Sequence, residues 1–359
     1  MESTWLVVSL PTWLYLAKEM AASLASGSQR TLHACGQVVI RGCLCNPTGR
    51  KAAPRQHNAP MDKQETATGL AFSVIIAVFN DWVPLDRCLR SLAEQKNAPS
   101  FEVIIVDDGS REAASEFIRH WIDCYPLTIV RQLHAGISIA RNRGIQISRA
   151  PVLIFVDADC RLQINCLQAL SSTISVSPQH SCFQLHLTGD CSSGPVGRAE
   201  ELRLMTVQTH LLEPNGCIRY LNTAGFAIRR DRVDTQLLFD PPVLRAEDTL
   251  LLANLMQNGE LPLFVGSAIV QHAIPLSLVE YLRKAIRSAY LEGRTFKIVA
   301  SRGVRIRVRH RERLRILLSM WKNSAQENIG RSAWFLVIAK QALQRIVSFS
   351  YRLLPVRSS

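Results

Sequence analysis

The chain has 359 residues, enough for one domain of about 220 residues with an extension at each end. Its ten cysteines have no regular spacing and mostly lie in apolar segments, which favours a reducing compartment over a disulfide scaffold, so we expect a cytoplasmic protein. The formal net charge of +13 is concentrated near the C-terminus, because residues 281–359 hold eighteen Lys or Arg against three Glu. The rest of the chain is therefore close to neutral.

The first 70 residues are predicted to form an extension outside the main domain. Residues 3–17 are apolar and uncharged, but the segment is short, contains Pro11 and has no basic leader, so it is a poor signal peptide. An interfacial helix is the alternative for this segment. Residues 22–70 are rich in Ser, Gly, Pro, Thr and Gln and have little periodicity, which is typical of a flexible linker.

Strands and helices are predicted to alternate from residue 72 to residue 156. Short apolar and β-branched runs predict strands over residues 72–80, 101–107, 127–132 and 151–156. Apolar side chains at helical spacing predict helices over residues 81–95, over 137–148 and, from an N-cap at Ser110, over the segment that ends near Trp121. This alternation is typical of an α/β fold with a mostly parallel sheet flanked by helices.

An acidic turn, Asp157-Ala158-Asp159, directly follows the apolar run at 151–156. A buried strand that ends in such a turn places negative charge at the carboxyl edge of the sheet, where open α/β sheets bind ligands. Alternation along a strand would direct both carboxylates to one side, where they could share one divalent ion that holds a diphosphate. The alternative is a solvated turn that needs no ligand.

Five motifs follow one another in a recognisable order. They are Ser-Val-Ile-Ile-x-x-x-Asn at 73–80, Val-Asp-Asp-Gly-Ser at 106–110, Ala-Arg-Asn-x-Gly at 140–144, Val-Asp-Ala-Asp at 156–159 and Ala-Glu-Asp-Thr at 246–249. Together they resemble family 2 glycosyltransferases of the GT-A fold, over about residues 71–290. The resemblance implies a GT-A domain, which we place at 71–280. It also implies that a sugar moves from a nucleotide-sugar donor to an acceptor hydroxyl with inversion, in the synthesis of a glycan, a lipid-linked glycan or a polysaccharide.

The resemblance implies donor contacts for four residues. Asp108 is similar to the carboxylate that accepts a hydrogen bond from the nucleotide base, with Ala77 near the same base. Arg141 is similar to an arginine near the donor diphosphate, for which a guanidinium is well suited, and Asp157 would face the ribose or the sugar. From the residues alone, Asp107 and Asp108 are also competent to cap the following helix, and a helix arginine is usually a surface residue.

The resemblance implies a metal site at Asp159 and His272. Oxygen ligands of this kind suit Mg²⁺ or Mn²⁺, which would offset the charge on the departing nucleoside diphosphate. Position 160 is a cysteine where many relatives have another aspartate, so the choice of metal stays open. Cys160 and Cys166 have no histidine or cysteine at metal-ligand spacing and are expected to be packed side chains. A lone histidine after a strand is more often structural, which is the alternative for His272.

Asp248 is the general base that the resemblance implies, and its neighbour Glu247 would shape the acceptor site. A carboxylate at this position also gains from the dipole of the helix that follows, so a simple helix cap is the alternative. The Gln-x-x-Arg-Trp pattern of processive synthases does not follow Asp248. A single-addition enzyme is therefore favoured over a polymerase.

A basic, partly amphipathic helical tail is predicted for residues 281–359. Seven arginines are packed between Ser301 and Arg315, namely Arg302, Arg305, Arg307, Arg309, Arg311, Arg313 and Arg315, and apolar side chains follow. Such a segment suits the surface of an anionic bilayer, at about 1 kcal/mol per cation. Nucleic-acid binding competes, but the interleaved aliphatic side chains disfavour it and we expect no nucleic acid. A charged helical face packed on the domain is the third possibility.

Two other functions stay open from the sequence. A nucleotidyltransferase also has a nucleotide-binding α/β sheet, but it usually has a Gly-rich phosphate loop after the first strand, and residues 81–84 are Asp-Trp-Val-Pro. A catalytically inactive, transferase-like binding or scaffold module at the membrane is the other, although Asp108, Asp157, Asp159 and Asp248 are all present.

Overall fold

The computed structural model describes residues 69–112, 118, 121–232, 238–240, 242–273, 276–303, 310–326 and 328–353. All of them belong to one compact unit, Glu65–Ser359. The predicted N-terminal extension up to residue 68, most of the predicted helix after Ser110, and three arginines of the predicted cluster, Arg305, Arg307 and Arg309, lie outside the described residues.

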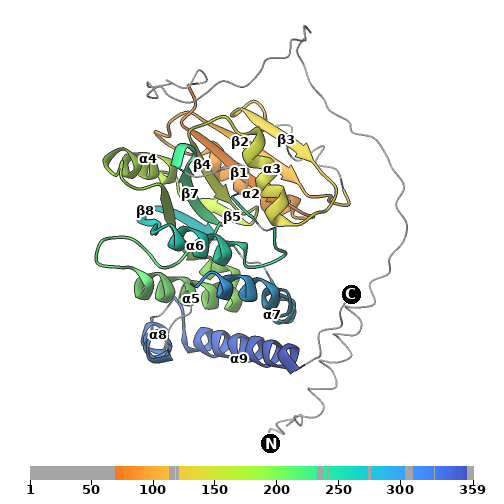
Figure 1. The fold of residues 1–359 in the computed structure, drawn as a ribbon, viewed down its shortest axis with the longest axis vertical. Coiled ribbons are helices and arrows are strands. Elements are labelled where there is room, and N and C mark those ends of the chain that lie inside the picture. The colour runs from red at the N-terminus through yellow and green to blue at the C-terminus, as the bar shows by residue number, and fades with distance from the viewer. Residues whose placement is uncertain are drawn as a thin grey trace, which may run out of the picture. The chain divides into compact units, whose positions relative to one another are not determined.

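An eight-stranded sheet forms the centre of the unit, in the order β3-β2-β1-β4-β7-β6-β8-β5 (Figure 1). The first half is parallel: β3 (Leu127–Arg131), β2 (Phe101–Asp107), β1 (Phe72–Val78) and β4 (Val152–Val156). Helices α2 (Trp82–Ala93) and α3 (Ile137–Ile147) connect strands of this half. Because parallel strands end at one edge, β2 and β4 deliver Asp108 and Asp157 to the same edge. The predicted alternation of strands and helices is confirmed here.

The second half of the sheet is mixed. β7 (Gly225–Arg229) is antiparallel to β4 and to β6 (Cys182–Gly189), whereas β8 (Leu263–His272) is parallel to β6. The short strand β5 (Cys160–Leu162) is antiparallel to β8, and this pairing places Cys160 opposite His272. Helices α4 (Cys166–Val176), α5 (Pro195–Leu211) and α6 (Glu247–Gln257) connect these strands, with short 3-10 turns at η2 (Cys191–Ser193) and η3 (Arg230–Arg232).

The core has a layer on each face of the sheet, as the two-residue period of a strand requires. Val74 and Ile76 of β1 lie in the cluster that includes the buried side chains of α2 and α4. Ile75 belongs to the opposite cluster, with side chains of α3 and α6. Gly144 of α3 is needed for this packing, because a Cβ at that position would clash with the Ile75 side chain.

Three long helices follow the sheet: α7 (Leu278–Ser301), α8 (His310–Asn323) and α9 (Arg331–Leu353). A capping box between Ser277 and Glu280 starts α7. Helix α5 contacts β6 on one side and α8 and α9 on the other, so α8 and α9 form an outer layer beyond α5 (Figure 1). Among the described residues, no helix is both long and apolar enough to cross a membrane.

Candidate active site at the carboxyl edge of the sheet

Asp108 follows β2, and its carboxylate is enclosed by the loop that leads into α3. Oδ1 accepts hydrogen bonds from Gln132 Nε2 at 2.7 Å and Ala135 N at 2.9 Å, and Oδ2 accepts one from Gly136 N at 2.9 Å. His134 Nδ1 lies 2.9 Å from Oδ2. These four neighbours occupy the acceptor positions of a carboxylate. Asp108 therefore organises this loop, and the predicted base contact would require one of these donors to be displaced.

An aromatic pair lies beside Asp108. The rings of Phe79 and His134 are stacked, with centroids 4.2 Å apart and an interplanar angle of 23°. Phe79 directly follows β1 and is exposed, and the next residue, Asn80, has a φ of 60° that is uncommon outside glycine. Ala77, two residues earlier, pairs with Val106 of β2 in the sheet. The sequence motifs point to neither Phe79 nor His134; the available signal was an aromatic side chain at the end of the first strand.

Arg141 links two predicted site carboxylates. Its side chain is only 2% exposed, and its guanidinium donates to Asp157 Oδ1 and to Glu247 Oε1, each at 2.6 Å. Burial alone would lower the pKa of Arg141, but Asp157 and Glu247 raise it above its ordinary value. The surface alternative for this arginine is therefore wrong. A contact between Arg141 and a diphosphate stays a prediction.

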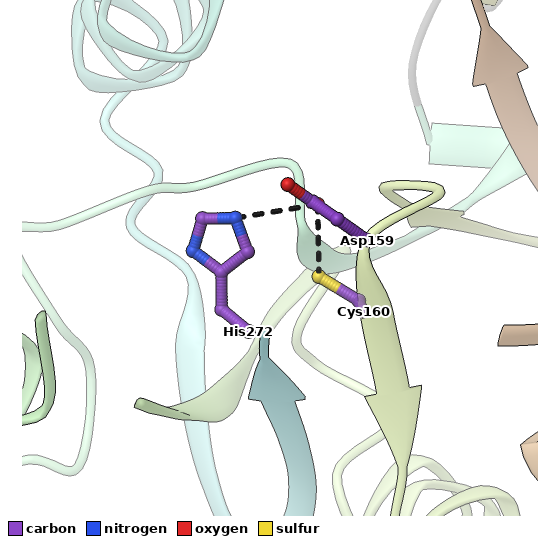
Figure 2. Close-up of side chains that lie close together, drawn as sticks. All are labelled: Asp159, Cys160 and His272. Carbon is purple, nitrogen blue, oxygen red and sulfur yellow. Dashed lines mark hydrogen bonds and ion pairs between the residues drawn. The ribbon is translucent and has the colours of Figure 1, made fainter. Parts of the chain in front are cut away.

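Asp159, Cys160 and His272 come together where β5 pairs with β8 (Figure 2). His272 Nε2 lies 3.3 Å from Asp159 Oδ1, and its Nδ1 lies 3.7 Å from Glu200 Oε1. Glu200 is buried in α5 and also accepts a hydrogen bond from Arg203 Nε at 2.9 Å. Burial alone would lower the pKa of His272, but the two carboxylates raise it to about 10. The imidazole is thus held between Asp159 and Glu200.

This cluster bears on two sequence-based interpretations. Asp157 pairs with Arg141, whereas Asp159 belongs to a group of possible metal ligands among the described residues. The reason is that β4 ends at Val156, so the alternation of a strand does not continue through the turn. Cys160 and Cys166 are buried, as expected of packed side chains, and strand pairing also gives Cys160 a histidine neighbour that sequence spacing could not reveal.

The donor chemistry of the cluster fits a divalent ion. The Asp159 carboxylate oxygen suits Mg²⁺ or Mn²⁺, whereas His272, whose pKa is raised to about 10, would have to lose a proton before its imidazole nitrogen could bind Mn²⁺. The Cys160 thiol fits less well, because burial raises its pKa well above the ordinary value and keeps it protonated. Glu200 is positioned to hold the far nitrogen of the imidazole, as outer carboxylates do at many metal sites. No sequence motif marks Glu200.

Asp248 lies in the first turn of α6, next to Glu247. Its Oδ1 accepts hydrogen bonds from Thr249 N at 2.6 Å and Thr249 Oγ1 at 3.2 Å, both from the next residue in the chain. Burial and the adjacent Glu247 raise the pKa of Asp248 to about 7. A carboxylate with such a pKa can accept a proton near neutral pH. The predicted position of Asp248 at the start of a helix is confirmed.

Comparison with known proteins finds a family match over part of the chain. Residues 73–233 match glycosyl transferase family 2, and this segment is called the family 2 domain below. The family 2 domain is similar to the uncharacterised glycosyltransferase YibD of Escherichia coli, 38% identical over 88 residues that cover 24% of this chain and 25% of that protein. It is also similar to the glycosyltransferase AglE of Haloferax volcanii, 34% identical over 113 residues that cover 31% of this chain and 37% of that protein.

The matches to these relatives thus span about a quarter to a third of their length. Among solved structures, a mannosyltransferase from Pyrobaculum calidifontis, in complex with GDP-Man and Mn²⁺, is similar in fold, with a TM-score of 0.52 and 13% identity over 79% of this chain and 88% of that one. At this identity the likeness shows the fold alone. The family 2 domain has the GT-A fold, as the motifs predict.

The fold connects two parts of the unit through Arg141. Its partner Asp157 follows β4 in the parallel half, and its other partner, Glu247, directly precedes Asp248 at the start of α6. Glu247, which is 106 positions from Arg141 in the sequence, is thus linked to the acidic turn through the Arg141 side chain. The arrangement joins the predicted donor and acceptor regions, while Asp159 and His272 form a separate group at the same turn.

Proposed function

We propose that this protein transfers a sugar from a nucleotide-sugar donor to an acceptor hydroxyl, with inversion at the anomeric carbon. The observation that carries this proposal is Asp248: in a chain whose residues 73–233 match glycosyl transferase family 2, its carboxylate is bonded only to Thr249 among the described residues and its pKa is about 7. It is therefore free to accept a proton from a substrate. Single addition to a glycan or lipid-linked acceptor is the reaction that we infer.

The reaction is a single in-line displacement. Asp248 takes the proton of the acceptor hydroxyl while its oxygen forms the new bond to the anomeric carbon. The bond from that carbon to the nucleoside diphosphate breaks on the opposite side, which inverts the configuration. Glu247 is the weaker base, because its Oε1 is paired with the guanidinium of Arg141 at 2.6 Å. Glu247 instead raises the pKa of Asp248 by its nearby negative charge.

The donor would lie along the edge that carries Asp108 and Asp157. The exposed face of the Phe79–His134 pair offers a surface on which a nucleobase can stack, a contact that is worth about 1–3 kcal/mol per base. Asp108 holds the adjacent loop, and the partly exposed Asp157 can reach the ribose or the sugar while Arg141 fixes its orientation. Near Asp157, a charged diphosphate requires a counter-ion.

Asp159 and His272 would hold that counter-ion. A bound divalent metal would supply charge neutralisation for the departing diphosphate. After loss of the proton that its raised pKa retains, the His272 ring would be oriented by Glu200 through Nδ1, with Nε2 directed toward the metal and Asp159. Mn²⁺ suits this mixed oxygen and nitrogen set better than Mg²⁺.

The proposal is tested by incubating the purified protein with a panel of nucleotide sugars and Mn²⁺. We expect slow hydrolysis of one donor and a higher melting temperature in its presence, because a ligand that binds the folded state stabilises it. Asp159→Ala should weaken binding of this donor, measured by calorimetry. A protein that responds to no donor by either readout would instead be a binding or scaffold module.

A further inference from the structure

The outer face of α8 carries a stripe of exposed apolar side chains. Leu314, Leu318 and Trp321 are 56%, 62% and 41% exposed, and Phe335 of α9 is 59% exposed. The spacing of four and then three residues places the three α8 side chains on one face of the helix. Large apolar side chains are ordinarily exposed singly, so a contiguous set of this size indicates an interaction surface.

The opposite face of the two helices is fixed to the domain. Ile316 and Met320 of α8 and Ala333 and Val337 of α9 are buried in a cluster with Ala199 and Leu202 of α5. Trp334 Nε1 donates to Leu317 O at 3.2 Å, which ties α9 to α8. Because these contacts fix the orientation of both helices, the apolar stripe is directed away from the rest of the unit.

Cations flank the stripe. Arg311, Arg315 and Lys322 are exposed along the same side of α8, and the guanidinium of Arg331 lies 3.8 Å from the centre of the Trp321 ring. Among the described residues of α8 and α9, Glu312 is the one acid, and it is paired with Arg219 of the domain at 2.7 Å. The face formed by Leu314, Leu318, Trp321 and Phe335 and these flanking cations is called the α8–α9 outer face below.

We propose that the α8–α9 outer face docks the protein on an anionic lipid bilayer. Leucine and aromatic side chains would enter the boundary between headgroups and acyl chains, and the arginines and lysine would contact anionic headgroups. No helix among the described residues is suited to cross a membrane, so α8 and α9 would lie in the plane of the surface.

Other occupants match the α8–α9 outer face less well. A second copy of this face would cover the leucines but would bring arginine against arginine, which is repulsive. A nucleic acid would contact the cations but would leave the two leucines without apolar partners. An anionic bilayer satisfies both the cations and the apolar side chains at once.

The test is vesicle co-sedimentation of the full chain, with phosphatidylcholine vesicles that contain or lack phosphatidylglycerol. We expect binding only to the anionic vesicles, weakened by salt. Arg311→Gln with Arg315→Gln should lower the affinity about 30-fold, because each cation contributes about fivefold. Leu314→Ser with Leu318→Ser should also release the protein. The matched controls are Arg143→Gln on α3 and Val176→Ser on α4, where Val176 is 78% exposed.

Three results would overturn the proposal. One is anionic-vesicle binding that is unchanged in both double variants. The second is a change of oligomeric state, measured by light scattering, in the leucine variant with unchanged vesicle binding, which would assign the face to a second copy. The third is loss of RNA or DNA binding in the arginine variant without loss of vesicle binding. Donor affinity of each variant, which should equal that of the parent, shows that the domain is folded.

Discussion

Asp108 directly follows β2 and Asp248 lies in the first turn of α6, and the surroundings of these two predicted site carboxylates differ. Asp108 is surrounded by four donors from the loop that precedes α3. Asp248 accepts hydrogen bonds only from Thr249 among the described residues, and burial beside Glu247 raises its pKa to about 7. A carboxylate with its acceptor positions filled stabilises structure, whereas one with open positions and a raised pKa can take part in proton transfer.

Removal of Asp248 is the largest expected effect on turnover. Asp248→Asn should lower the turnover number by about 10²- to 10⁴-fold, because it removes the general base, and should keep donor affinity. Turnover and calorimetric donor affinity are measured on the same preparation, with Asp123→Asn, an exposed site, as the control. Full activity in the Asp248 variant would exclude it as the base.

The carboxylate of Glu200 should strengthen the binding of a metal ion by Asp159 and His272. Glu200→Gln should lower Mn²⁺ affinity by about 10- to 100-fold, because the carboxylate that holds His272 Nδ1 is lost. Titration followed by the electron paramagnetic resonance signal of free Mn²⁺ gives the affinity without an activity assay. The control is Glu201→Gln, since Glu201 instead accepts a hydrogen bond from Gly189 N at 2.5 Å. Equal affinities in both variants would contradict a role for Glu200.

The pH dependence should follow Asp248. The base must be deprotonated and its pKa is about 7, so turnover should rise about tenfold per pH unit below 7 and level off above it. The stability effect has the opposite sign: between the ordinary carboxyl pKa of 3.8 and about 7 the folded chain keeps a proton that the unfolded chain loses, so this contribution falls as pH rises. A turnover midpoint near 4 would show that Asp248 is not the titrating group.

Substitution of Asp108 should change the free energy of unfolding more than it changes the rate of the transfer step. Asp108→Asn removes an acceptor oxygen from the loop before α3 and should lower the free energy of unfolding by about 1–3 kcal/mol, measured by urea denaturation. Asp123→Asn again provides the control. Unchanged unfolding together with lost donor affinity would instead place Asp108 in direct contact with the nucleotide base.

The sequence predicted the strands, helices and acidic motifs of the parallel half well. The reason is local: β-branched runs, helical spacing and turn residues are each read within about ten positions. The mixed half was harder to predict from the sequence, because β6, β7 and β8 pair across long separations in the chain. The side-chain neighbours that this pairing creates were therefore not predicted. His272 beside Cys160, and Glu200 beside His272, exist only through strand pairing and helix packing.

The sequence by itself indicated the resemblance to family 2 glycosyltransferases, the GT-A fold and the identity of the acids at the sheet edge, since these depend on short motifs in a fixed order. Only the tertiary structure decided which of those carboxylates already have their acceptor positions filled by hydrogen bonds from the protein. Hydrogen-bond partners and burial depend on residues that are distant in the chain, such as the 106 positions between Arg141 and Glu247. The same packing decided which face of α8 is directed outward.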